Sequence, residues 1–128
     1  MTSYSFARTH KNLAQIMTDK DLASLGDAYV NFAYSLALSN KEGKPVGTKV
    51  KGSVLAEAVK KAGLRVQLPS RMNRHSLADA AEALLAYAWL KKCITLAETV
   101  EQLSSMHSAV DNLSRLLLVT VQRVKFSS

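Results

Sequence analysis

The sequence has a single cysteine, Cys93, among its 128 residues. One cysteine forms neither an intrachain disulfide nor a cysteine-rich zinc site, so both classes of protein are excluded. No apolar run reaches the roughly 18 residues that span a bilayer, and the N-terminal run MTSYSFARTHK has no apolar signal core. These absences predict a soluble, cytoplasmic protein that contacts no membrane.

Proline and glycine are also scarce, with two and five residues respectively. Alanine and leucine are abundant and β-branched residues rarely alternate with polar ones, so the pattern predicts an all-α fold. The length and the 48% hydrophobic content fit one helical domain over residues 1–128, with enough apolar side chains for a core. We expect helices at about residues 10–17, 19–39, 48–61 and 76–93, and one or two more over 95–126 with a joint near 104–108.

The second of these helices has its large apolar side chains three and four residues apart, which is the spacing of one helical face. We expect Thr18 to cap its start, with Asp21 in the capping-box position. The run SNKEGKPVG at residues 39–47 predicts the loop that follows. The expected apolar face consists of Leu22, Leu25, Tyr29, Phe32 and Leu36.

Positive charge is concentrated in the middle of the chain. The sequence has 17 Lys and Arg against 10 Asp and Glu, a net charge of +7, and residues 41–74 alone have nine basic and two acidic side chains. Such a segment is typical either of a solvated surface or of a protein that binds a polyanion, above all a nucleic acid. The first candidates for phosphate contacts are Lys49 and Lys51, at an expected helix start, and then Arg71 and Arg74.

Three carboxylates lie in otherwise apolar helices. Asp27 is the only charged residue between Leu22 and Ser39, and Asp79 and Glu82 are the only ones between Ser76 and Leu90. Because these helices are apolar on nearly every face, we expect the carboxylates to be buried and compensated by a cation, hydrogen bonds or a metal ion.

Asp79 and Glu82 are three residues apart and therefore share a helix face. If the two helices pack together, Asp27 joins them, and Gly26 would allow a close approach. Oxygen ligands from three carboxylates suit Mg²⁺ or Mn²⁺, and the neighbouring basic segment favours metal-assisted hydrolysis of phosphodiesters. A single aspartate within a helix is more often only hydrogen-bonded.

The same residues resemble a known family. The run LGDA at residues 25–28 resembles the core of the ribonuclease III signature, and LADAAEALLA at 77–86 resembles the family's second acidic motif, usually written DAFEALIGA. The run SRMNRHS at 70–76 resembles the basic stretch before that motif. The order and the gap of about fifty residues between the motifs also match. The resemblance extends over residues 22–92 and points to short forms, an archaeal group and Mini-ribonuclease III, that have no separate double-stranded-RNA-binding domain.

The resemblance implies an all-helical endonuclease that works as a homodimer and cuts both strands of double-stranded RNA, leaving 5′-phosphate and 3′-hydroxyl ends. Asp27 matches the signature aspartate that acts with the metal. Asp79 and Glu82 match the pair that binds Mg²⁺, with Mn²⁺ as a substitute. No organic cofactor is implied. The basic residues would contact RNA phosphates and supply salt-dependent affinity.

Two positions depart from the family pattern. Ala23 stands where the family usually has a glutamate, although the short forms also have a small residue there. Ser24 replaces a large apolar residue used in dimer packing. Asn31, one turn after Asp27, could supply an oxygen or position a water molecule.

These departures keep a second function open, a protein of the same fold that binds double-stranded RNA with little or no cutting. Two other classes fit less well. An all-α nucleotide pyrophosphohydrolase typically shows several E-x-x-E and E-x-x-D pairs, whereas the apolar helices here have only Asp79-x-x-Glu82. A helix-turn-helix regulator needs a short basic recognition helix, and none stands out.

Overall fold

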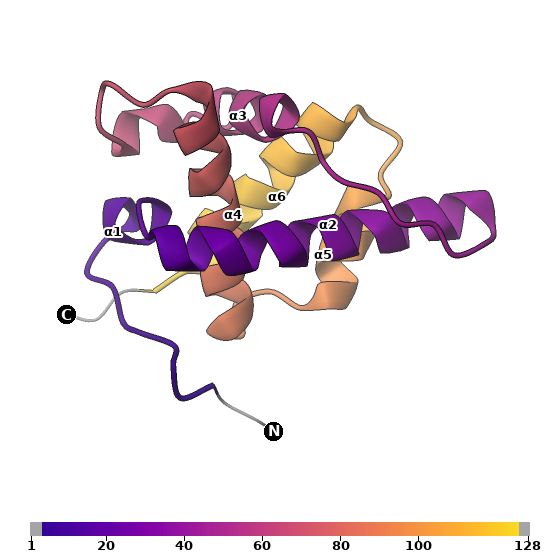
Figure 1. Ribbon diagram of the computed structural model, residues 1–128, viewed down its shortest axis with the longest axis horizontal. Helices are drawn as coiled ribbons and strands as arrows, with labels where there is room; N and C mark the ends of the chain where they lie inside the picture. Colours follow the sequence, from indigo (N-terminus) through magenta and orange to yellow (C-terminus); the bar gives the residue numbers. More distant parts are fainter. Residues whose placement is uncertain (1–3, 126–128) are drawn as a thin grey trace.

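The computed structural model describes residues 4–125, and it is all-helical over that range, which confirms the predicted fold class. Figure 1 shows α2 crossing the central helix α4, with the remaining helices around them. The end of the last expected helix, residue 126, lies outside the described residues. The elements are α1 (Leu13–Met17), α2 (Lys20–Glu42), α3 (Gly52–Lys61), the 3₁₀ turn η1 (Leu64–Gln67), α4 (Arg74–Leu90), α5 (Leu96–Leu103) and α6 (Ala109–Arg123).

Side-chain caps determine where the helices start. The predicted capping of α2 by Thr18 is wrong, because the Thr18 hydroxyl donates to the Ala14 carbonyl at 2.7 Å. Asp19 is the cap instead: its Oδ1 accepts from the backbone N–H groups of Asp21 and Leu22 at 3.0 and 3.1 Å. A carboxylate that accepts two hydrogen bonds at the positive end of a helix is the stronger of the two caps.

The other boundaries differ from expectation by a few residues. Helix α4 starts at Arg74 because the Asn73 side chain accepts from the Ser76 N–H at 2.8 Å. Helix α3 starts only at Gly52, after an extended segment. The predicted joint near residues 104–108 is confirmed between α5 and α6.

Helix α4 is the centre of the core. From Leu77 to Leu90 all of its residues are buried except Asp79 and Trp89, which are half-buried. It packs against α1, α2, α3 and α6. Among residues 4–125, none of the helices is both long enough and apolar enough to cross a membrane.

Only part of the expected apolar face of α2 packs against the core. Its large apolar residues lie partly outside the core, and Leu25 and Phe32 are 40% and 55% exposed. Small residues allow α2 and α4 to approach closely, and the larger side chains beside them are left near the surface. The buried face of α2 consists of Ala23, Gly26, Val30, Ala33 and Ala37.

Candidate functional site

Gly26 lies where α2 crosses α4, and it faces the backbone of Glu82. A Cβ atom added to Gly26 would lie 1.9 Å from the Glu82 carbonyl oxygen. No side chain fits into that space, so this approach of the two helices requires glycine. The contact confirms the predicted role of Gly26 and brings the next residue, Asp27, near Glu82.

Glu82 is buried and lies among other carboxylates. Only 7% of its surface is exposed. Burial raises the pKa of Glu82 to about 8, and the neighbouring carboxylates of Asp27 and Asp79 add to this rise. Without a cation, Glu82 therefore holds a proton at neutral pH. The structure thus brings together the three carboxylates that the sequence singled out.

The predicted burial is correct for Glu82 only. Asp79 is half-buried, and Asp27 is exposed. Asp27 lies on α2 beside the face that contacts α4, where no further helix covers it. Because Asp27 is open to solvent, the site can be reached from outside the protein.

Two basic side chains lie against Asp79. Lys20 Nζ donates to Asp79 Oδ2 at 3.0 Å, and His75 Nε2 lies 3.6 Å from the same oxygen. Lys20 was missed by the sequence analysis, since 59 residues separate it from Asp79 and no local pattern connects them. The ammonium compensates the charge of the half-buried carboxylate.

Asn31 connects Asp27 to the segment before α3. Its Nδ2 donates to Asp27 Oδ1 at 3.1 Å, and its Oδ1 accepts from the Val50 N–H at 2.8 Å. The amide oxygen that the sequence offered as a ligand is therefore already used by the backbone. Asn31 orients the Asp27 carboxylate instead.

A basic cavity opens between the starts of α3 and α4. Its volume is about 420 Å³, and its lining includes Gly52, Ser53, Arg74 and His75. Lys51 precedes Gly52 as the N-cap of α3 and makes no capping bond with its side chain. The first N–H groups of both helices point toward this end of the protein and favour an anion. His75 connects the cavity to the carboxylates through Asp79.

The four predicted phosphate contacts, Lys49, Lys51, Arg71 and Arg74, are all exposed. Arg74 lines the cavity, whereas Arg71 lies in the loop before α4 and is absent from the lining. Arg65 supports that loop, because its guanidinium donates to the carbonyls of Pro69 and Ser70 at 2.8 and 2.5 Å.

The donor set is chemically suited to a hard divalent cation, because every donor is a carboxylate oxygen. Within residues 4–125, however, no three acidic, His or Cys side chains are already arranged to hold a metal ion. Asp79 is turned toward Lys20, and Ala23, in place of the usual glutamate, is buried and supplies no oxygen. Asp27 and Glu82 are close enough for their charges to interact, and neither forms an ion pair with a basic side chain among residues 4–125.

Comparison with known proteins identifies the family of the chain. No curated protein matches the chain. The sequence model of the family described as Ribonuclease III matches residues 20–120. This range includes both acidic motifs and helices α2 to α5. The match covers most of the chain and agrees with the all-helical fold, and so this protein belongs to the ribonuclease III family.

Proposed function

We propose that the protein is a metal-dependent endoribonuclease that hydrolyses phosphodiester bonds of double-stranded RNA and leaves 5′-phosphate and 3′-hydroxyl ends. The observation that carries the proposal is the crossing at Gly26, which brings Asp27 near the buried Glu82. Carboxylates crowded in this way repel one another and destabilise a fold, and a bound cation removes the repulsion. Such an arrangement suits a metal site better than a purely structural one.

In this proposal Asp27, Asp79 and Glu82 hold Mg²⁺, or Mn²⁺ in its place. The ion would supply an activated water and would stabilise the leaving oxygen. Glu82 would bind the ion as the deprotonated carboxylate, and Asp79 would bind it in place of its present contact with Lys20, whose ammonium would then be available to a phosphate oxygen. Asn31 keeps the Asp27 carboxylate oriented throughout. The cavity between α3 and α4 holds a backbone phosphate next to the carboxylates.

The direct test is cleavage of a short labelled RNA duplex. We expect cutting with Mg²⁺ and none with EDTA. Asp79→Asn should lower the rate at least about 100-fold, because the carboxylate loses its charge while the fold is kept. Asp21→Asn is the matched control, since Asp21 is exposed and lies 3.7 Å from Arg8. Normal Mg²⁺-dependent cutting by Asp79→Asn would show that the site is wrongly assigned.

Affinity for RNA should depend on the predicted phosphate contacts. With Lys49 and Lys51 both changed to alanine, we expect weaker binding and a slope of log K against log salt that is smaller by about one to two. Circular dichroism checks that the variant is folded, and Lys41→Ala with Lys44→Ala serves as the charge-matched control. An unchanged slope would place the RNA surface elsewhere.

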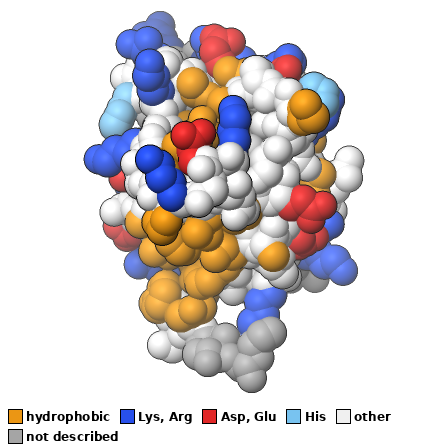
Figure 2. Space-filling model, turned by 90° about the vertical axis from the view of Figure 1, so that its right-hand side faces the viewer, with side chains coloured by type: hydrophobic (Ala, Val, Ile, Leu, Met, Phe, Trp, Pro, Cys, Tyr) orange, Lys and Arg blue, Asp and Glu red, His pale blue; other side chains and the backbone are white. Residues whose placement is uncertain are grey.

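We propose a homodimer in which the exposed apolar side of α2 contacts a second copy. Leu25 and Phe32 are seven residues apart and therefore lie on one side of the helix, two turns from each other. Their exposure next to the site is unfavourable in water unless another surface covers them. Figure 2 shows hydrophobic side chains gathered in the lower part of one face of the protein, with smaller separate groups elsewhere on that face. A second copy is the favoured occupant, because two copies would provide one site for each strand.

Phe32→Asp should convert the dimer to a monomer, because it introduces two charges into a symmetric contact. Light scattering over a range of concentrations measures the mass. Leu118→Asp is the control, since Leu118 is 42% exposed on α6. A wild-type protein that is monomeric at high concentration, or a Phe32→Asp variant that still dimerises, would argue against this interface.

The alternative function, an RNA-binding protein that cuts weakly or not at all, is favoured by one observation. Ala23 is buried and provides no carboxylate at the place of the usual glutamate. In that case duplex RNA would bind with the expected salt dependence, but neither Mg²⁺ nor Mn²⁺ would support cutting.

A further inference from the structure

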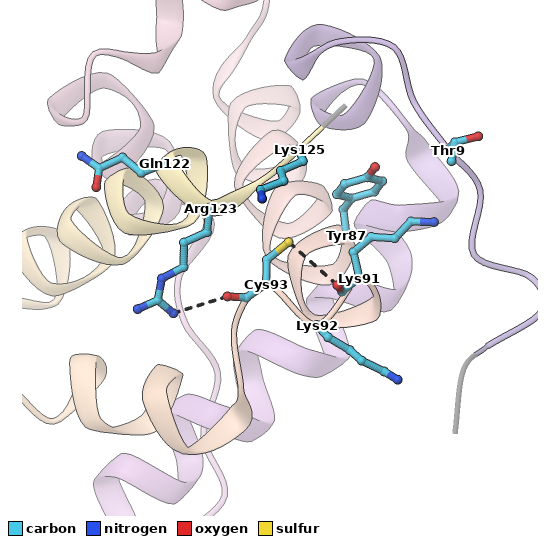
Figure 3. Close-up of a pocket in the computed structure, with 8 residues that line it drawn as sticks. All are labelled: Thr9, Tyr87, Lys91, Lys92, Cys93, Gln122, Arg123 and Lys125. Carbon is cyan, nitrogen blue, oxygen red and sulfur yellow. Dashed lines mark hydrogen bonds between the residues drawn. The ribbon is translucent and has the colours of Figure 1, made fainter. Parts of the chain in front are cut away.

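A second cavity, of about 760 Å³, lies at the opposite end of α4 from Asp79 (Figure 3). Twelve residues of helix separate Asp79 from Lys91, which is about 18 Å at the usual rise. The walls come from the turn that ends α4, from the end of α6 and the residues after it, and from Thr9. The cavity is therefore distinct from the carboxylate site. Its lining includes four cations, Lys91, Lys92, Arg123 and Lys125.

These four cations are only partly balanced. Glu98 pairs with Arg123, with Nη1 and Oε2 2.7 Å apart. None of the ion pairs among residues 4–125 involves Lys91, Lys92 or Lys125. Lys91, Lys92 and Lys125 thus have no acidic partner in the described range, so the cavity has a net positive charge that favours an anion.

Two of the cations are fixed in place before any ligand binds. Arg123 Nη1 also donates to the Cys93 carbonyl oxygen at 3.3 Å, as the dashed line in Figure 3 marks. The bond to Cys93 and the ion pair with Glu98 both use Nη1 of Arg123. The N–H groups of Nη2 and Nε are therefore not engaged by any residue in the described range. Lys91 Nζ lies 5.7 Å from the centre of the Tyr87 ring. A guanidinium fixed on one side can present its other side to an oxyanion with little loss of entropy.

Lys92 has a backbone conformation that favours glycine. Its φ is +62°, and it is the only non-glycine residue with positive φ among the described residues. It forms the turn after α4, where the Cys93 N–H donates to the Ala88 carbonyl at 2.7 Å. A lysine at this position costs about 1 kcal/mol relative to glycine. The chain therefore has a charged side chain at the cavity where glycine would be more stable.

We propose that this cavity binds a phosphate-bearing ligand with at least two negative charges. The ligand is either a free phosphate compound such as pyrophosphate or the terminal phosphate of an RNA strand. The cavity volume is within the range of small-molecule sites and larger than a single phosphate needs. The proposal does not depend on endonuclease activity, because none of the residues that carry it belongs to the carboxylate site.

Cys93 provides the test, because it lines the cavity and is the only cysteine in the chain. We would follow its alkylation by iodoacetamide, a neutral reagent, in the full-length protein with EDTA present. Pyrophosphate should slow the reaction at least about threefold at saturation. A short single-stranded RNA with a 5′-phosphate, compared with its 5′-hydroxyl form, distinguishes the two ligand sources. Protection by either phosphate ligand supports the site.

Lys92→Gly separates loss of binding from loss of folding. The substitution relieves the backbone strain at position 92, so the melting temperature of the variant should rise. It also removes one positive charge from the cavity, so the pyrophosphate concentration needed to protect Cys93 should increase about fivefold, as expected for one exposed charge pair. Lys44→Gln removes one charge from a distant loop and should change neither quantity. The proposal is overturned if no phosphate ligand protects Cys93, if sodium chloride at equal ionic strength protects it equally, or if Lys92→Gly is protected like the wild type.

Discussion

Gly26→Ala should destabilise the protein by about 2–4 kcal/mol, although alanine is the better helix former. The added methyl group would lie 1.9 Å from the Glu82 carbonyl oxygen and 2.4 Å from its carbonyl carbon. These are backbone atoms of a buried helix, so they cannot move aside as the end of a side chain can. The helices α2 and α4 would have to separate, and the core between them would lose contacts.

Urea denaturation followed by circular dichroism measures this effect. Gly47→Ala is the matched control, because Gly47 has an ordinary φ and nothing lies within 4 Å of its added Cβ. We expect a change below about 0.5 kcal/mol for the control. Equal midpoints for the two variants would mean that α2 and α4 do not approach as closely as the structure shows. A Gly26→Ala variant that still folds should also lose cutting, since Asp27 moves away from Glu82.

The sequence was sufficient to predict the parts of the fold that depend on local pattern. The all-α class, the joint between α5 and α6 and the close approach that Gly26 allows were predicted from composition and local pattern, and the structure confirms them. Helix starts were less predictable. Both Thr18 and Asp19 can cap α2, and the choice depends on the rest of the local structure: Asp19 also accepts from His10 Nε2 at 2.9 Å.

The errors share one physical cause, which is that hydrophobic spacing identifies a helix face but does not show what covers it. Helix α2 has the expected apolar face with Leu25 and Phe32, but α4 packs against the neighbouring face of α2, which consists of small residues. The same limit applies to the site. The spacing of Asp79 and Glu82 placed them on one face, yet only the structure shows that Glu82 is buried and that Lys20 holds Asp79.

Glu82→Gln should abolish metal-dependent cutting and, without metal, stabilise the fold. The pKa of Glu82 is raised to about 8 in the folded protein from an ordinary value of 4.5. Between about pH 4.5 and pH 8, the folded protein therefore keeps a proton on Glu82 that the unfolded chain has lost. The stability from this group is complete below about pH 4.5 and is lost as the pH rises to about 8, with a slope of about 1.4 kcal/mol per pH unit. Glutamine does not ionise, so the variant loses this dependence.

In EDTA at pH 8 the Glu82→Gln variant should therefore be more stable than the wild type by about 4 kcal/mol, and at pH 4 the two should be nearly equal. Thermal melts across this pH range measure the difference, with Glu101→Gln as the control because Glu101 is exposed on α5. Added Mg²⁺ should stabilise the wild type and leave Glu82→Gln unchanged, since only the wild type has the carboxylate to bind it. A variant that is less stable than the wild type at pH 8 would show that the buried carboxylate supports the fold. The combined result, a more stable variant that neither responds to Mg²⁺ nor cuts RNA, would mean that the fold tolerates an unfavourable charge in order to hold the metal ion.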